Sequence, residues 1–154
     1  MATIWNLNSG SVLRSGLSLL YTLDGQLLKK IYEDTSGSAT VYKCAVSADG
    51  SRLYVTNYTN NKLLTLSMDG AVLSSLEDPA ICSPRGVHVS ETGQLLVCED
   101  GAHSVVQVDG ERGVVTLISV EDRLNFPENV YHSARTDRLI VVQANDSIMI
   151  TNSK

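Results

Sequence analysis

The sequence predicts an all-β fold built from repeated antiparallel sheets, and three observations lead to this prediction. Short runs in which Val and Leu alternate with polar residues recur along the chain, and they are too short for helices. Turn-forming dipeptides such as Asp49-Gly50 and Asp69-Gly70 separate these runs. The runs also repeat with a period of 42 to 44 residues, which is typical of propellers and other repeat arrays.

The clearest copy of the repeat spans residues 84–118 and holds four predicted strands. These strands are Gly86–Val89, Gln94–Cys98, Ser104–Val108 and Val114–Ile118. Residues that favour turns separate each run from the next, so neighbouring runs are expected to pair as hairpins. Four such runs form one antiparallel blade.

Landmark residues align the other copies with this one. The second strands align at Leu53, Leu95 and Leu139, with steps of 42 and 44 residues. The third strands align at Leu63, Val105 and Ile148, with steps of 42 and 43. Near the N-terminus, Leu23-Asp24-Gly25 matches Met68-Asp69-Gly70 at a step of 45, so we expect the back half of an earlier blade there. The expected organisation is one segment over residues 1–154, with a partial blade at 10–32, blades at 40–77 and 84–119, and a partial blade at 128–152.

A low-forties period made of four strands indicates a partial β-propeller, with about three to four blades of a six-bladed ring. A single blade cannot bury both faces, so its neighbours supply the missing apolar surface. The three prolines, Pro79, Pro84 and Pro127, are expected in the connections between blades, because proline cannot donate a hydrogen bond inside a sheet.

Charge and composition narrow the classes of partner. The net charge is −5, with 12 basic and 17 acidic residues, and Lys29–Lys30 is the only adjacent basic pair. Because nucleic-acid binding draws much of its affinity from a basic patch, RNA is a weaker candidate than protein. No apolar run approaches the roughly 20 residues of a membrane span. The first residues lack a secretory signal pattern, which predicts a cytoplasmic protein or a truncated one.

The cysteines and histidines predict neither a metal site nor a catalytic centre. Cys44, Cys82 and Cys98 form no CxxC pair, and Cys44 and Cys98 fall in predicted strands, where they act as small apolar residues. His88 and His132 lie in first strands one position apart in register, so they are expected to face opposite sides. No ligand set at zinc spacing and no GxSxG elbow is present, so we expect no cofactor and no catalytic residue.

Three polar residues end the second strands, namely Asn57, Glu99 and Gln143. At this position, they could point toward the axis of a ring and hold a divalent cation. A hard cation prefers several oxygen ligands with more than one carboxylate, and only Glu99 is charged. Capping of turns or hydration of the axial channel is therefore the favoured role.

The pattern Pro84-x-Gly-Val-x-Val, Gly93-x-Leu-Leu-Val and Val105-x-x-Val-Asp-Gly resembles the NHL repeat, as found at the C-terminal end of animal tripartite-motif proteins. The resemblance implies a six-bladed disc of which this chain holds fewer than four blades. It also implies a protein-binding role, as in the substrate-selecting part of a ubiquitin ligase. The family's usual Asp after the second strand is replaced by Asn57, Glu99 and Gln143. The run Leu53-Tyr-Val-Thr-Asn also resembles the YVTN class of propeller repeat.

Propellers bind through the loops between second and third strands and through the connectors between blades. Here these segments are Tyr58–Asn61, Asp100–His103 and Ala144–Asp146, with the connectors Ser83–Arg85 and Asn125–Asn129. The candidate binding residues on this loop face are Tyr58, Asn61, Arg85, Asp100, His103, Phe126 and Asn129. Tyr and Arg are enriched in binding hot spots, and the others can stack or donate and accept hydrogen bonds.

The expected function is a non-enzymatic module that recognises a protein partner. An RNA-binding NHL domain is the first alternative, and it predicts a basic loop face centred on Arg85 and Lys62. A fragment of a six-bladed metal-dependent hydrolase or of a YVTN-type propeller is the second. Because an incomplete ring leaves blade edges open, self-association through those edges is also expected.

Overall fold

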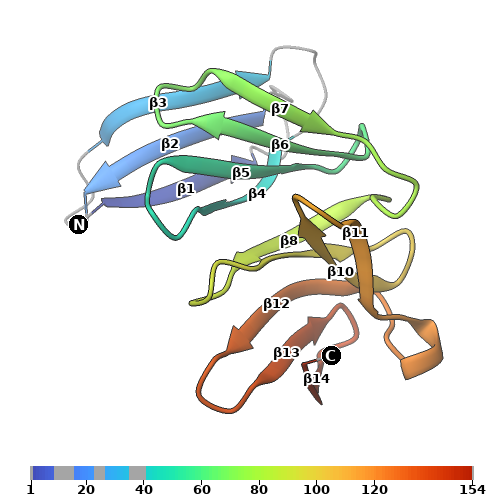
Figure 1. Cartoon of the computed structure of the whole chain (residues 1–154). Helices are drawn as coiled ribbons and strands as arrows, with labels where there is room; N and C mark the ends of the chain where they lie inside the picture. The colour runs from blue at the N-terminus through green and yellow to red at the C-terminus, as the bar shows by residue number, and fades with distance from the viewer. Residues whose placement is uncertain (1, 9–15, 23–26, 35–40, 154) are drawn as a thin grey trace.

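The computed structural model describes residues 2–8, 16–22, 27–34 and 41–153, and these form four antiparallel sheets (Figure 1). The first sheet contains β1 (Ala2–Asn8), β2 (Gly16–Thr22) and β3 (Leu27–Asp34). The second contains β4 (Val41–Val46), β5 (Arg52–Asn57), β6 (Lys62–Ser67) and β7 (Val72–Leu76). The third contains β8 (Pro84–Val89), β9 (Leu95–Glu99), β10 (Ser104–Asp109) and β11 (Gly113–Ile118). The fourth contains β12 (Pro127–Ser133), β13 (Arg138–Gln143) and β14 (Ser147–Asn152).

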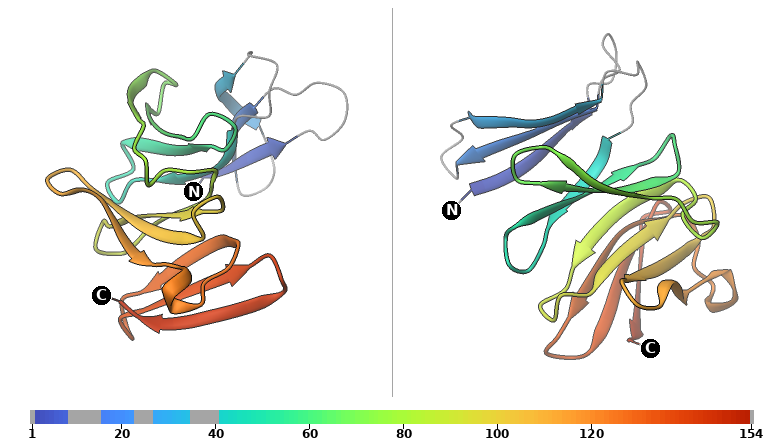
Figure 2. Two further views of the ribbon diagram at one scale, coloured as in Figure 1. Left: turned by 90° about the vertical axis from the view of Figure 1, so that its right-hand side faces the viewer. Right: turned by 45° about the horizontal axis from the view of Figure 1, so that its top comes forward.

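Each sheet is a meander in which consecutive strands pair, and the sheets follow one another in chain order (Figure 2). The first strands of successive sheets lie together, since β8 contacts both β4 and β12. The fold is therefore all-β and consistent with a partial propeller of blades, as the repeat predicts. Among the described residues, no helix is long and apolar enough to cross a bilayer; the one helical turn is the short 3-10 turn η1 (Val120–Asp122) before β12.

The tight turns have the backbone geometry that their sequences predict. Gly50 and Gly93, between the first and second strands of their sheets, have φ of 74° and 84°. Gly70, between β6 and β7, has φ of 89°. A positive φ is strained for residues with a Cβ, so glycine suits these hairpins. The predicted Asp24–Gly25 turn lies outside the described residues.

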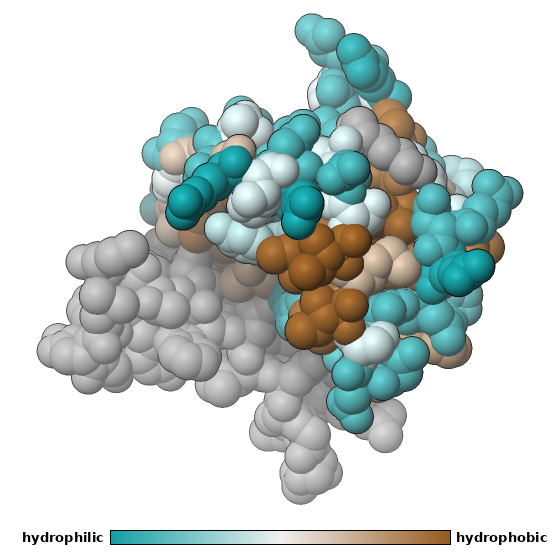
Figure 3. All heavy atoms as spheres, turned by 90° about the horizontal axis from the view of Figure 1, so that it is seen from below, coloured by the Kyte–Doolittle hydropathy of each residue, from teal (hydrophilic) through white to brown (hydrophobic). Residues whose placement is uncertain are grey.

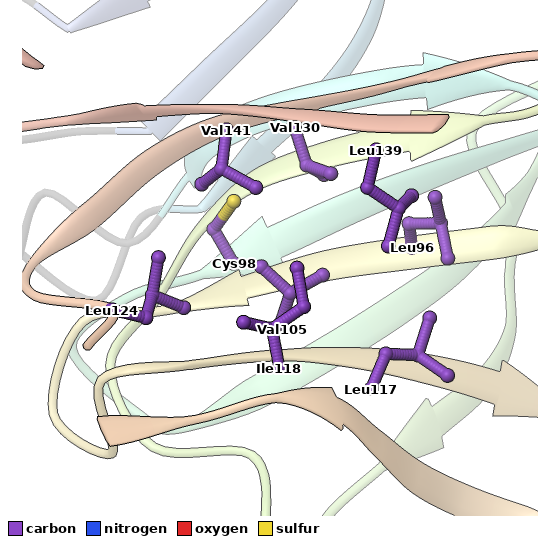
Figure 4. Close-up of a cluster of buried hydrophobic side chains, with 9 residues drawn as sticks. All are labelled: Leu96, Cys98, Val105, Leu117, Ile118, Leu124, Val130, Leu139 and Val141. Atoms are coloured by element: carbon purple, nitrogen blue, oxygen red, sulfur yellow. The ribbon is translucent and has the colours of Figure 1, made fainter. Parts of the chain in front are cut away.

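Apolar cores lie between successive sheets. Between the third and fourth sheets, aliphatic side chains of β9, β10 and β11 meet those of β12 and β13 (Figure 4). This cluster contains Leu96, Cys98, Val105, Leu117, Ile118, Leu124, Val130, Leu139 and Val141. A second cluster joins Leu63 of β6 to Leu95, Val97 and Val106 of the third sheet, with Ile81 of the connector. The third sheet is thus covered on both faces, which explains its nearly continuous apolar second strand.

The N-terminal sheet differs from the sequence prediction. The Asp-Gly landmark predicts only the back half of a blade at 10–32, whereas the structure adds β1 and forms three strands between Ala2 and Asp34. β1 begins at Ala2 and β5 at Arg52, a step of 50 residues, so β1 lies off the regular period and escapes an alignment based on it.

Two of the three prolines also lie elsewhere than predicted. Pro84 and Pro127 are the first residues of β8 and β12, paired opposite Glu99 and Gln143, and not part of the connectors. The first position of a strand tolerates proline, since the missing N–H is not needed for the ladder at that point. Pro79 does lie in the connector after β7.

The first-strand histidines face the same interface from opposite sides. His88 pairs across the strand with Leu96, and His132 pairs with Leu139. Both leucines belong to the cluster between the third and fourth sheets, so each histidine points toward the other's sheet. Burial, and then the nearby His132, lower the pKa of His88. The prediction that they face opposite sides of their own sheets is confirmed.

Candidate binding site

The polar residues that end the second strands hold neighbouring loops in place. Asn57, Glu99 and Gln143 are the last residues of β5, β9 and β13, and all three are buried. The backbone N–H of Cys82 donates to Glu99 Oε2 (2.8 Å), and that of Asn125 donates to Gln143 Oε1 (2.7 Å). Asn57 Oδ1 accepts from the N–H of Asn60 in its own loop (3.1 Å). Asn57 therefore caps its adjacent turn as predicted, whereas Glu99 and Gln143 hold the connectors that precede their sheets.

Of the three residues that end the second strands, only Glu99 has an ionisable side chain. Its side chain is fully buried, and within the described residues its second oxygen, Oε1, has no hydrogen-bond partner. Burial raises its pKa to about 8, although the Cys82 N–H acts in the opposite direction. Glu99 is therefore mostly neutral at pH 7 and resembles Gln143 in shape and in accepting a connector N–H, although Gln143 Nε2 also donates to Ser147 Oγ (2.8 Å).

The loops that follow β5 and β9 make a second contact with the connectors, which we call the loop clamp. Asn61 Oδ1 accepts from the backbone N–H of Ser83 (2.8 Å), and His103 Nδ1 accepts from that of Phe126 (3.0 Å). Asn61 and His103 occupy equivalent loop positions with φ of 53° and 47°. The β5–β6 and β9–β10 loops therefore each hold the connector that enters the next sheet.

The main charged group on the loop side is centred on Arg85. Its Nη2 lies 3.2 Å from Asp100 Oδ2, and its Nη1 donates to Glu128 Oε1 (2.8 Å). Tyr58 Oη donates to the same Asp100 oxygen (3.3 Å). The guanidinium carbon lies 5.8 Å from the ring centroid of Tyr42 and 5.5 Å from that of Tyr58, within cation–π range. We call Tyr42, Tyr58, Arg85, Asp100 and Glu128 the Arg85 cluster.

Three members of the cluster occupy the same register position in the first strands of three successive blades. Tyr42, Arg85 and Glu128 each follow the first pairing residue of β4, β8 and β12, with steps of 43 residues. β8 and β12 approach closely beside it, since a Cβ added to Gly86 would lie 2.4 Å from the carbonyl oxygen of Glu128. Lys43, at the register position of Gly86, donates a hydrogen bond to Asn129 Oδ1 two blades away.

The cluster is preformed and partly open to solvent. The side chains of Arg85, Asp100 and Glu128 are 22%, 11% and 36% exposed. An arginine held by two carboxylates and two rings loses little freedom when it binds a partner, because its rotamer is already set. The arrangement can offer a flat guanidinium, tyrosine hydroxyls and carboxylate oxygens to a polar surface.

The structure brings together some of the predicted binding residues and separates others. Tyr58, Arg85 and Asp100 meet in the cluster. Asn61 and His103 serve as connector clamps, and the His103 ring packs edge-on against Phe126, with centroids 4.3 Å apart. Phe126 remains 46% exposed, and it, like Arg123 after the 3-10 turn, has a positive φ.

Two predicted connectors extend less far than expected. Arg85 and Asn129 lie in β8 and β12, not in loops, because those strands begin at Pro84 and Pro127. Loop-based reasoning consequently missed Tyr42, Lys43 and Glu128. The constant step of 43 between Tyr42, Arg85 and Glu128 is the sequence signal that could have identified them.

A shallow hollow of about 460 Å³ lies between the β5–β6 loop and the connector from β7 to β8. It is lined by Asn60, Asn61, Glu77, Asp78, Pro79, Ile81 and Cys82. Lys62 Nζ lies 2.9 Å from Glu77 Oε1 near this hollow. No aromatic residue lines it, so it is a weaker binding candidate than the Arg85 cluster.

The described part of the chain contains neither a metal-binding cluster nor an activated thiol. No group of three or more His, Cys, Asp or Glu side chains there could hold a metal ion. Burial raises the pKa of Cys44 to about 12, and burial followed by Glu99 raises that of Cys98 further. Both thiols are therefore poor nucleophiles.

Comparisons with known proteins agree with the fold. No family model and no curated protein matches the chain. Among solved structures, it is similar to virginiamycin B lyase from Staphylococcus aureus (TM-score 0.62, 12% identity, 99% of this chain and 60% of that one). It is also similar to a Bacteroides caccae protein of unknown function (TM-score 0.70, 15% identity, 90% and 56%). A putative 6-phosphogluconolactonase from Bacteroides uniformis is a third (TM-score 0.59, 16% identity, 90% and 44%).

These similarities define a propeller-like β-repeat protein. At such identities they show the fold alone, and the chain spans 60% or less of each of these three structures. The resemblance to the NHL repeat stays a prediction.

Proposed function

We propose that this chain is a non-enzymatic interaction module that recognises a protein partner through its loop face. The observation that carries the proposal is the Arg85 cluster, in which residues from three blades hold an arginine against a pair of neighbouring tyrosine rings. Arginine and tyrosine contribute most to protein–protein hot spots, and their preordering lowers the entropic cost of binding. By its NHL resemblance, the module would select substrates for a tripartite-motif ubiquitin ligase in the cytoplasm.

The RNA alternative is weakened by the ion pairs of its two central residues. Arg85 contacts Asp100 and Glu128, and Lys62 contacts Glu77, so neither offers an uncompensated charge to a phosphate. Phosphate binding derives its affinity from releasing counterions, and an internally paired cation releases few. Single-stranded RNA is expected to bind weakly at physiological salt. A steep loss of RNA binding with salt would instead support this alternative.

The hydrolase alternative has no support among the described residues, where no metal-binding group is found. The similarity to a lyase and to a putative lactonase reaches only 12% and 16% identity and concerns the fold. Heat on titration with calcium or zinc would revive this alternative.

The proposal can be tested by cross-linking the full chain in a native extract and mapping the cross-links on both partners. We expect a captured protein whose cross-links fall on the loop face and whose capture is lost in Arg85→Ala. Arg112→Ala, in the exposed turn between β10 and β11, is the matched control and should keep the partner. Phe126→Ala removes a half-exposed ring and provides a second loop-face variant if Arg85→Ala unfolds.

Two results would contradict the proposal. One is a partner retained equally by wild type and both loop-face variants, because binding would then lie elsewhere. The other is a capture that disappears after ribonuclease treatment, because the contact would then be made through RNA.

A further inference from the structure

Two residues of the described chain combine a positive φ with a position directly before a proline. Ser83 (φ 53°) precedes Pro84, and Phe126 (φ 44°) precedes Pro127. A proline pushes the residue before it toward extended backbone, and a positive φ is strained for a residue with a Cβ. Contacts from other segments must therefore hold both residues in this conformation.

Ser83 is held through both of its backbone polar groups. Its N–H donates to Asn61 Oδ1 (2.8 Å), and its carbonyl oxygen accepts from the N–H of Asp100 (3.2 Å). The side-chain acceptor in this loop clamp is an amide oxygen, which does not change its protonation with pH. The clamp on Ser83 is therefore expected to be independent of pH.

Phe126 is held by an equivalent pair of contacts, but its side-chain acceptor is an imidazole. Its N–H donates to His103 Nδ1 (3.0 Å), and its carbonyl oxygen accepts from the N–H of Ala144 (3.0 Å). The three residues lie 42 to 44 positions beyond their counterparts in the Ser83 clamp. Because a backbone N–H can only donate, Nδ1 must be unprotonated and the ring carries its proton on Nε2. This clamp therefore exists only while His103 is neutral.

Phe126 also differs from the other apolar side chains at the surface. Figure 3, which views the molecule from the end where β12, β13 and β14 lie, shows apolar side chains gathered at the centre of that surface. Of the ten exposed large apolar residues in the described part of the chain, only Phe126 has a positive φ. Its ring is 46% exposed and packs edge-on against the His103 ring, with centroids 4.3 Å apart. The clamp thus fixes the direction of an exposed aromatic ring.

We propose that His103 is a pH-sensitive latch on the connector that leads into β12, the latch being the contact of its Nδ1 with the N–H of Phe126. Imidazoles take up a proton between about pH 7 and about pH 5. The added proton replaces the Nδ1 lone pair by an N–H that faces the N–H of Phe126, so the hydrogen bond is lost. Phe126 then relaxes toward a negative φ, and its ring leaves the His103 ring. Asn125 remains bound to Gln143 Oε1 (2.7 Å), which keeps the movement local.

Charged groups surround the latch on four segments. They are Asp100 in the loop of His103 itself, Glu121, Asp122 and Arg123 in the connector, Glu128 in β12, and Asp146 in the β13–β14 loop. Within the described ranges, no ion pair joins the His103 ring to a carboxylate. His88, His132 and Glu99 are further groups that can contribute to a pH dependence of the chain. A test of the latch must therefore leave these three unchanged.

NMR spectroscopy of the full chain tests the latch directly. At about pH 7.5, spectra of the imidazole nitrogens should show the proton of the His103 ring on Nε2. Amide hydrogen exchange, corrected for the intrinsic rate at each pH, should show that the protection factor of the Phe126 N–H falls by about fivefold toward pH 5, as expected for the loss of one hydrogen bond. The Ser83 N–H should keep its protection factor and is the internal control.

Exchanging the two acceptors supplies a matched pair of variants. His103→Asn copies the Asn61 clamp and places at this positive φ a residue that tolerates it, so the protection of Phe126 should become independent of pH. Asn61→His copies the imidazole clamp and should make the protection of Ser83 fall at acidic pH. Both variants retain His88, His132 and Glu99, so the comparison with wild type isolates the exchanged acceptor.

Three results would overturn the latch. The first is a His103 ring that carries its proton on Nδ1 at neutral pH. The second is an equal response of Phe126 to pH in wild type and His103→Asn. The third is a loss of protection at Ser83 as large as that at Phe126 in the wild type, because acid would then loosen the chain as a whole. All are measured on the chain alone, so this inference stands apart from the protein partner proposed for the loop face.

Discussion

The third and fourth sheets have similar sequences but different surroundings. Their second strands read Leu95-Leu-Val-Cys-Glu and Leu139-Ile-Val-Val-Gln, and both end in a buried residue that holds a connector. Every residue of β9 is buried, whereas β13 alternates between buried and more exposed positions. The difference arises from neighbours, because the third sheet has one on each side and the fourth is open on its outward face. In this repeat, burial is a property of blade pairs and not of the single blade.

The largest effect on the free energy of unfolding should come from truncating aligned aliphatic side chains to alanine in the third and fourth sheets. Leu96→Ala should lower the free energy of unfolding by about 3 kcal/mol, because Leu96 is buried between sheets and the substitution leaves a cavity. Ile140→Ala, at the aligned position, should cost about 1 kcal/mol, since its site is only partly buried. Urea unfolding at a concentration that keeps the chain monomeric measures both. Equal losses would mean that the outward face is covered within the monomer.

The next comparison concerns the buried ends of β9 and β13. The pKa of Glu99 is raised from its ordinary value of 4.5 to about 8, so the folded state holds a proton that the unfolded state releases. Stability is then highest below pH 4.5 and declines as pH rises toward 8. Glu99→Gln copies Gln143, keeps an acceptor for the Cys82 N–H and removes this decline. At pH 7 the gain should be on the order of 3 kcal/mol.

Unfolding midpoints of wild type and Glu99→Gln, measured from pH 4.5 to pH 8, provide the check. The two curves should meet at the acidic end and separate as the pH rises. Parallel curves would show that Glu99 ionises in the folded protein at little cost.

A third prediction tests the close contact between β8 and β12. Gly86→Ala should destabilise the chain by about 1–3 kcal/mol, because its Cβ would lie 2.4 Å from the Glu128 carbonyl oxygen and 2.9 Å from the Asn129 Cα. Gly110→Ala is the matched control, since nothing lies within 4 Å of its Cβ position and it should be nearly neutral. Thermal unfolding of both variants decides the matter, and equal midpoints would contradict the close approach.

The smallest expected effect concerns the loop clamps. Asn61→Ala removes the acceptor of the Ser83 N–H and should cost about 1 kcal/mol. Asp146 has a similar backbone, with φ of 59°, but the described residues give its side chain no such N–H partner. Asp146→Ala should therefore lower the free energy of unfolding only by the strain of alanine at positive φ, which Asn61→Ala also incurs. The difference between the two variants in urea unfolding isolates the hydrogen bond, and no difference would show that the clamp is dispensable.

Sequence patterns predicted the strands well because their signal is local. Alternation, Asp-Gly and Thr-Gly turns, and the repeat step place β4 to β14 to within a few residues. β1 was missed because its step to β5 departs from the period. Pro84 and Pro127 were misplaced because the rule against proline in strands does not apply to a strand's first residue.

The candidate site was only partly predictable for a different reason. Tyr58, Arg85 and Asp100 were identified as residue types suited to loops on one face. Tyr42, Lys43 and Glu128 act only because three first strands lie side by side, and the contacts across them span 43 to 86 residues. The composition of the loops does not indicate such contacts, whereas the constant step of 43 residues between Tyr42, Arg85 and Glu128 does indicate them.

The two kinds of clamp have a consequence for how such repeats diverge. Glu99, Gln143, Asn61 and His103 all accept from backbone N–H groups of the connectors, which almost every amino acid provides. Apart from the buried Ile81 and Leu124, the side chains of the connectors are then free to vary, and selection need preserve only the two acceptors that hold each connector. Connectors that keep this one buried aliphatic residue can differ in the rest of their composition without disturbing the spacing of the blades. A lineage could in this way remodel its recognition surface while its architecture outlasts any recognisable similarity of sequence.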